Sequence, residues 1–240
     1  MGQNPADPWE RWNRHVYAFN DKLDEAVLKP VATAYSNAVP EVARRGVSNF
    51  FGNASDAWSA VNNFLQGKFD RGLHDIVRVG TNTLFGIFGL FDVAGELGME
   101  RYSEDFGQTL GVWGLRTGPY MVLPLFGPSS VRETFALPVN QAASPAGAFG
   151  DSSTQYALTT LSIVNTRAGL LGAGRLLDDI ALDKYTFVRD AYLQRRRSLV
   201  RDGAEEPDEP WEGDDKPPSE PAAPAAAAPA ASAPASGPSK

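Results

Sequence analysis

The chain has 240 residues, no cysteine and a formal net charge of −7. The missing cysteines exclude disulfides and thiolate chemistry within this sequence. The acidic balance excludes the strongly basic face that a nucleic-acid-binding protein needs, so no nucleic-acid partner is expected.

Helical periodicity dominates the N-terminal part of the sequence. Apolar residues recur at steps of three and four over residues 9–27, which places them on one helix face. Asp7 followed by Pro8 is typical of a helix start, and Pro30 predicts the end of this helix.

More helices are predicted between the first helix and residue 79. They cover residues 41–51, 55–65 (opened by Asn53 or Ser55) and 68–79, and a short piece over 31–39 before them ends at Pro40. In the helix over 55–65, Trp58, Val61 and Leu65 share one face, and we expect that face to point inward.

Residues 84–91 are the most informative segment, because they hold three Phe, three aliphatic residues, two Gly and no charge. A helix that crosses a bilayer needs about 20 apolar residues, so the segment is too short to span. It is also too apolar and glycine-rich for an ordinary amphipathic surface helix. We expect it either at the centre of a large core or against lipid without spanning it.

The second half of the chain is also predicted to be helical. The expected helices cover residues 92–98 (capped by Asp92), 103–113, 131–137, 152–164 and 176–198, with a loop over 138–150. Ser130 and Glu133 have the spacing of a capping box. Strand signals are confined to short pieces such as Tyr120–Leu123, so the fold class is all-α.

The end of the chain differs in composition. Residues 204–240 hold nine Pro, eleven Ala and a net charge of −6, with Trp211 as the only aromatic residue. Such a segment cannot bury enough apolar surface to fold, so we predict a disordered Pro/Ala-rich tail. The organisation is then a linker over 1–6, one helical domain over 7–203, and the tail.

Residues able to support catalysis are few. His74 and Asp75 are adjacent, but without further histidines a surface helical pair is favoured over a metal site. No nucleophile elbow or phosphate-binding loop is found, so neither an enzyme nor a cofactor is expected. For Arg195, Arg196 and Arg197, complementing a helix C-terminus is favoured over contact with anionic headgroups.

Motifs in a fixed order resemble those of the MlaA (VacJ) lipoprotein family, over nearly all of residues 7–197. They include Asp7-Pro8-Trp9-Glu10, Lys29-Pro30-Val31-Ala32, Gly46-Val47-Ser48-Asn49-Phe50-Phe51, Leu65-Gln66-Gly67-Lys68, Asp105-Phe106-Gly107-Gln108-Thr109-Leu110-Gly111 and Asp183-Lys184-Tyr185. Members carry a signal peptide and a lipidated N-terminal Cys. This sequence has neither, so we interpret it as a mature region without the acylation site.

The resemblance implies an all-α, ring-shaped protein in the periplasmic leaflet of the outer membrane of a Gram-negative bacterium, lipid-anchored in the native form and beside a trimeric porin. It would take mislocalised phospholipids from the outer leaflet through a central amphipathic channel to a periplasmic, MlaC-like carrier. Phospholipid is then the transported ligand. Two alternatives stay open: a periplasmic helical scaffold that holds no lipid, and a lipid hydrolase.

On this basis three groups of residues become candidates. Residues 106–125 would form or gate the channel, chiefly through Phe106, Leu110, Trp113, Tyr120 and Leu123. Asn49, Phe50 and Phe51 would support the gate by packing. The lipid-immersed segment would consist of Leu84, Phe85, Ile87, Phe88, Leu90 and Phe91. For each Phe, plain core packing is the alternative.

Overall fold

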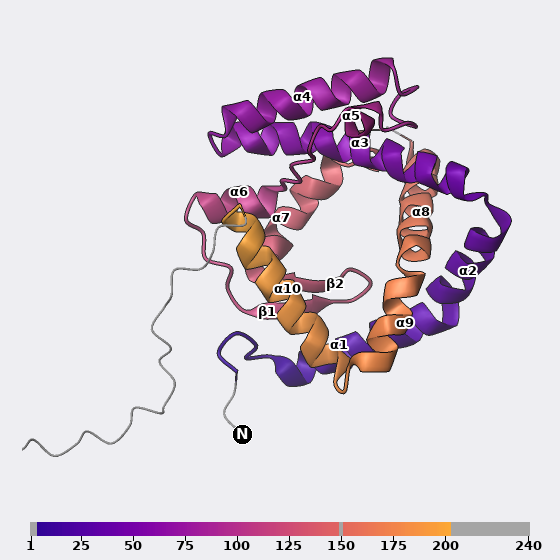
Figure 1. Ribbon diagram of the computed structural model, residues 1–240. Coiled ribbons are helices and arrows are strands. Elements are labelled where there is room, and N and C mark those ends of the chain that lie inside the picture. Colours follow the sequence, from indigo (N-terminus) through magenta and orange to yellow (C-terminus); the bar gives the residue numbers. More distant parts are fainter. Residues whose placement is uncertain (1–3, 149–150, 203–240) are drawn as a thin grey trace, which may run out of the picture. The chain divides into compact units, whose positions relative to one another are not determined.

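A computed structural model describes residues 4–148 and 151–202 of the chain. Its helices belong to one unit, Met1–Glu205, and follow one another around a central gap (Figure 1). The predicted all-α class and ring-shaped arrangement are confirmed, with a two-stranded hairpin as the sheet of the described part. The predicted disordered tail, 204–240, lies outside the described residues.

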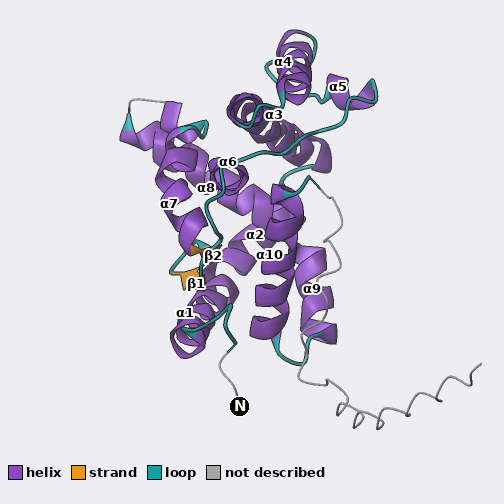
Figure 2. Cartoon of the chain, turned by 90° about the vertical axis from the view of Figure 1, so that its left-hand side faces the viewer, coloured by secondary structure: helices purple, strands orange, loops and turns teal. Residues whose placement is uncertain are grey.

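The elements follow in chain order. They are α1 (Glu10–Leu23), a π turn η1 (Asp24–Leu28), α2 (Lys29–Ala38), α3 (Glu41–Leu65), α4 (Phe69–Leu84), α5 (Val93–Glu96), α6 (Phe106–Val112), β1 (Tyr120–Leu123), β2 (Gly127–Ser130), α7 (Val131–Ala142), a 3-10 turn η2 (Ala146–Ala148), α8 (Ser152–Gly169), α9 (Leu171–Ile180) and α10 (Lys184–Val200). Figure 2 shows α3, α4 and α5 at one end of the unit and α1 with the strands at the other.

Two predictions at the first helix are wrong. Pro30 does not stop it, because the chain passes through the π turn and Pro30 then lies in the first turn of α2, where a missing N–H costs little. Asp7 does not cap α1, which begins after Trp9. Asp7 is buried instead and accepts hydrogen bonds from Asn13 and Tyr185.

Helix α3 corrects two further predictions. The helices predicted over 41–51 and 55–65 are one unbroken helix that passes through Gly52. A Cβ atom at Gly52 would lie 2.9 Å from the Arg101 guanidinium. Glycine at this position admits Arg101 against the helix and does not end it. The predicted inward face is also wrong, since Val61 and Leu65 are exposed.

Helix ends in the second half are set largely by side-chain caps. Asp92, Asp105, Ser130 and Asp183 each accept a hydrogen bond from the N–H three residues on, as N-cap residues do. The caps at Asp92 and Ser130 confirm the prediction. The Asp183 cap divides the helix predicted over 176–198 into α9 and α10.

Three helix lengths also differ from the prediction. Helix α7 continues through Pro138, because a helix can lose one hydrogen bond to proline and go on. The predicted loop over 138–150 therefore starts later. Helix α8 extends to Gly169, and α6 begins only at Phe106.

The apolar core is small and lies between α1, the hairpin and α10. Strands β1 and β2 are antiparallel, with Tyr120 opposite Ser130, and the predicted strand is confirmed. Val16, Tyr120, Val122 and Tyr185 form the core cluster. This packing closes the circuit of helices at the end opposite α4.

Candidate functional site

Helix α4 carries its apolar face on the outside. Phe69, Leu73, Ile76 and Leu84 are all exposed, and Leu84 reaches 78% exposure. Their spacing of three, four and eight residues puts them on one side of the helix. Such a stripe would normally be buried in a protein that is surrounded by water.

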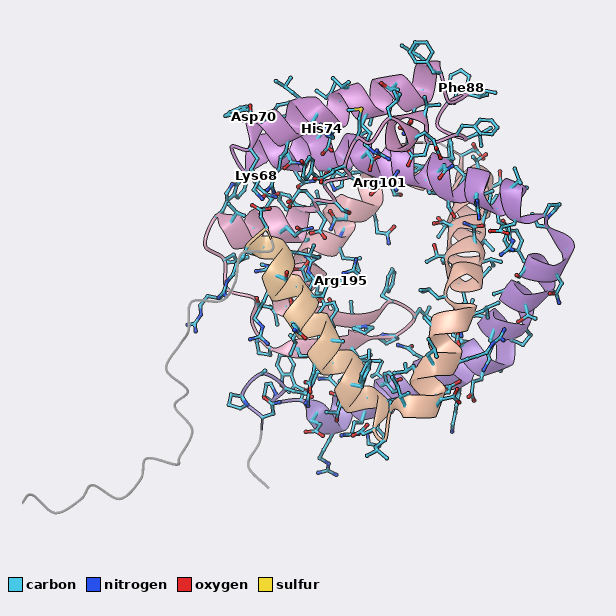
Figure 3. All side chains as sticks on the ribbon, viewed as in Figure 1. Lys68, Asp70, His74, Phe88, Arg101 and Arg195 are labelled. Atoms are coloured by element: carbon cyan, nitrogen blue, oxygen red, sulfur yellow. The ribbon has the colours of Figure 1, made fainter. Side chains whose placement is uncertain are left out.

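Residues 84–91 extend this apolar surface past the end of α4. Phe88 is 74% exposed and lies at the outer end of the α3–α4 pair (Figure 3). The alternative of a core position is therefore wrong for this segment. Ile87 and Phe88 both adopt positive φ, which costs energy for a β-branched or bulky residue and marks a tightly specified turn.

The turn is held by backbone hydrogen bonds and by one close contact. The N–H groups of Gly86 and Gly89 donate to the Asn82 carbonyl at 3.0 and 2.9 Å. A Cβ at Gly89 would lie 2.7 Å from the Asn53 Cβ. The segment is thus fixed against α3 while its large side chains point outward.

The interior between α3 and α4 is ionic. Arg78 is only 2% exposed, and its guanidinium donates to Asp56 at 3.0 Å and to Asp92 at 2.6 Å. Arg101 approaches the same Asp56 carboxylate at 3.0 Å. Burial raises the pKa of Asp56, although the two guanidinium groups oppose that shift.

Asp75 forms a second buried polar contact, one turn from Arg78. Its carboxylate accepts hydrogen bonds from Ser59 and Asn63, both at 2.9 Å, and burial raises its pKa. The predicted surface pair is therefore wrong for Asp75. Its neighbour His74 packs edge-on against Tyr102, with ring centroids 5.2 Å apart.

A third polar cluster joins α10 to α6 and α7. Arg196 donates to Asp105 at 2.6 Å and to Glu133 at 2.5 Å. Burial favours a raised pKa for Asp105, but its hydrogen bonds from Arg196 and Gln108 outweigh burial and hold the pKa below its ordinary value. Arg196 is thus an internal ion-pair partner, whereas the sequence favoured a helix-end role for the whole arginine cluster.

The sequence of this chain matches a known protein family. The family model of the MlaA lipoprotein matches residues 5–199. The chain belongs to the MlaA lipoprotein family.

Relatives and a solved structure agree with this assignment. The intermembrane phospholipid transport system lipoproteins MlaA of Escherichia coli and Shigella flexneri are each 36% identical over 211 residues, covering 86% of this chain and 83% of theirs. An uncharacterized protein of Rickettsia bellii is 34% identical over 196 residues, covering 81% and 77%. A structure described as the structural basis for maintenance of bacterial outer membrane lipid asymmetry superposes with a TM-score of 0.71 at 36% identity, covering 81% of this chain and 98% of that one.

The predicted gate support contacts the apolar segment in this MlaA-family chain. The Asn49 side-chain amide donates to the Leu90 carbonyl at 3.1 Å. Phe50 and Phe51 are partly buried and stack edge to face, with centroids 5.4 Å apart. The structure thus connects the predicted gate support with residues 84–91, while a role in gating stays a prediction.

The predicted channel residues do not form one surface. Phe106 and Trp113 stack edge to face at 6.3 Å, and the Trp113 indole donates to the Leu65 carbonyl. Leu110 and Leu123 are partly buried, whereas Tyr120 is fully buried in the core cluster. The side chain of Tyr120 therefore cannot line a channel.

The burial of these polar residues was not predicted, although the sequence carries a signal for it. Asp75, Arg78 and Asn82 are spaced by three and four residues, which places them on the face of α4 opposite its apolar stripe. All three are buried. The helical period that was applied to apolar residues, applied also to these polar residues, would have predicted a buried polar face on α4.

Two kinds of feature are absent from the part of the chain that the structure describes. Over residues 4–148 and 151–202, the structure holds no helix with the length and hydropathy needed to cross a membrane. Within the same ranges, His, Asp and Glu side chains do not gather into a group of three that could hold a metal ion.

Proposed function

We propose that this protein is the outer-membrane component of a retrograde phospholipid transport system that maintains lipid asymmetry. In the native form it would be anchored by a lipid and would lie in the periplasmic leaflet of a Gram-negative outer membrane. It would take phospholipids that have strayed to the outer leaflet and hand them to a periplasmic carrier. The names of the relatives and the subject of the similar structure support this role.

The inverted distribution of side chains is the observation that carries the proposal. Among the described residues, eighteen polar or charged residues are buried, against ten apolar ones of which six are alanine. Large apolar residues are exposed on α4 and residues 84–91. Proteins in water bury large apolar residues and rarely bury so many polar ones. An outer surface in contact with acyl chains explains both halves of the pattern.

A ring of helices with this outer surface would provide a path for phospholipid headgroups. A phospholipid that crosses a bilayer unaided drags its charged headgroup through hydrocarbon, where unpaired polar groups cost several kcal/mol. A polar channel at the centre of the ring would shelter the headgroup while the acyl chains stay in lipid. No bond is made or broken in this process, so the protein acts as a conduit and not as an enzyme. A trimeric porin would hold the ring in place.

The first test is purification of the full chain in detergent, followed by lipid extraction and quantification. We expect phospholipid to be recovered with the protein, and we expect the protein to precipitate when detergent is removed. A monodisperse protein that carries no phospholipid in detergent-free buffer would contradict the conduit and favour the scaffold alternative. Turnover of phospholipid to free fatty acid would instead favour the hydrolase.

The second test places two charges on the apolar segment. The double variant Ile87→Asp, Phe88→Asp should move the protein from the membrane fraction to the released fraction in a cell-fractionation assay, because buried carboxylates are costly in lipid. The matched control is Gln194→Asp, Ser198→Asp, which adds the same charge at exposed positions of α10. Unchanged membrane association of the first variant would contradict our placement of residues 84–91.

A further inference from the structure

A cavity of about 560 Å³ lies where α1, the π turn, α9 and α10 meet. These elements converge on one side of the ring in Figure 1, with β2 beside them. The volume lies within the range of small-molecule sites. The cavity is separate from the candidate residues described above, none of which lines it.

The walls of this cavity combine apolar side chains with charges of both signs. Leu170, Leu177 and Phe187 supply apolar surface. Four cations and four anions also line it, so the ionisable side chains sum to no net charge: Lys29, Arg167, Arg175 and Lys184 with Asp21, Asp24, Glu25 and Asp178. A ligand with both signs of charge and an apolar part would match this lining.

Some of these charges are already paired and fix the walls. Arg167 at the end of α8 donates two hydrogen bonds of 2.7 Å to Asp24 in the π turn. Lys184 approaches Asp178 at 2.6 Å. A bidentate arginine–carboxylate pair is geometrically specific, so it holds the π turn against the α8–α9 corner.

Other charges in the cavity are available to a ligand. Among the residues that the structure describes, Arg175, Asp21 and Glu25 take part in no ion pair. The π turn presents Glu25 beside Asp24 on the cavity wall. Such turns occur often at functional sites, because the wider turn redirects side chains.

We propose that this cavity binds the headgroup of a zwitterionic phospholipid, with the phosphate on Arg175 and the ammonium group on Asp21 and Glu25. The first part of the acyl chains then lies along Leu170 and Phe187. An anionic headgroup without an ammonium group leaves both carboxylates unpaired and repels them, so the site discriminates by charge. This assignment rests on the proposed function and names the lipid class that the conduit takes.

The experiment compares two lipids with identical acyl chains, phosphatidylethanolamine and phosphatidylglycerol. Each is titrated into the full chain in detergent micelles, and bound lipid is counted by native mass spectrometry. The unaltered protein should bind phosphatidylethanolamine about tenfold more tightly, because one charge-assisted contact is worth about that factor. Arg175→Glu should weaken the binding of both lipids, because both carry the phosphate, and Asp21→Asn with Glu25→Gln should bring the two lipids to similar affinity.

Matched controls separate the possible outcomes. Arg116→Glu makes the same charge change as Arg175→Glu at an exposed position outside the cavity and should leave both affinities unchanged. Arg175→Gln, which introduces no new charge, should also weaken the binding of both lipids. Lipid binding without preference, or a preference that Asp21→Asn with Glu25→Gln keeps, would overturn the cavity assignment while the conduit stands. Failure of the unaltered protein to bind either lipid would overturn the conduit as well.

Discussion

The two ends of the ring bury opposite kinds of side chain. Between α3 and α4, the buried contacts are made by Asp56, Asp75 and Arg78, and the apolar residues face outward. Between α1, the hairpin and α10, the buried cluster consists of apolar and aromatic residues. In lipid, exposed apolar surface carries no penalty, whereas polar groups must find partners inside the protein. The comparison therefore supports our proposal that the α3–α4 end meets hydrocarbon.

Both ends nevertheless use polar side chains to fix geometry. At the hairpin end, the Asn13 side chain accepts from the Val122 N–H at 2.9 Å and donates to the Tyr120 carbonyl at 3.1 Å. It satisfies the edge of β1, where unpaired backbone groups would otherwise be costly. Specific hydrogen bonds thus occur at both ends, and the cluster of buried valines and tyrosines lies at the hairpin end.

The largest effect should come from breaking the ionic interior of the α3–α4 pair. Arg78→Ala removes the buried guanidinium that Asp56 and Asp92 share, and breaking a buried ion pair in this way costs about 3–5 kcal/mol. The free energy of unfolding in detergent micelles, followed by circular dichroism, measures it. Arg116→Ala, at an exposed position, is the control. Equal stability of the two variants would mean that the ion pairs do not hold this end.

The same substitution made at each end tests the difference between the two ends directly. Val122→Ala in the hairpin core should lower the free energy of unfolding by about 2 kcal/mol, because Val122 is 2% exposed. Val77→Ala on α4, where the valine is 56% exposed, should change it by less than about 0.5 kcal/mol. Denaturant titration of both variants in the same detergent checks this. The reverse order would show that the core lies at the other end.

The class of the fold and most helices followed from the sequence, because apolar periodicity and capping residues act locally. Asp92 and Ser130 cap the helices that they were expected to cap. The predicted stop at Pro30 and the predicted break between the helices over 41–51 and 55–65 were wrong. The chain passes through the π turn just before Pro30, and the Arg101 side chain, from far along the chain, occupies the space beside Gly52 within the unbroken helix.

The candidate site was only partly accessible to sequence reasoning. Composition left two positions open for residues 84–91, a large core or an exposed surface. The structure shows that the large side chains of this segment are exposed. The partners of Arg78 and Arg196 could not be predicted, since they come from other helices. The burial of Tyr120 depends on contacts with α10 that no local pattern encodes.

The smallest of these effects lies where the two ends are joined. Asp105 caps α6 by accepting from the Gln108 N–H at 2.9 Å and also binds Arg196 of α10. Asp105→Asn keeps a capping side chain but removes the charge, so it should cost about 1.5 kcal/mol at pH 7. The free energy of unfolding of both proteins, measured from pH 7 downward, gives the difference.

The pH dependence of that difference has a definite sign. The pKa of Asp105 is held below its ordinary value of 3.8 in the folded protein, so its contribution is complete above pH 3.8. The contribution is lost as the pH falls through the lowered folded pKa, and the unaltered protein and Asp105→Asn should then converge. Asp70→Asn, at an exposed position of α4, is the control substitution. A gap that stays constant into strong acid would show that the Asp105–Arg196 charge pair does not join α6 to α10.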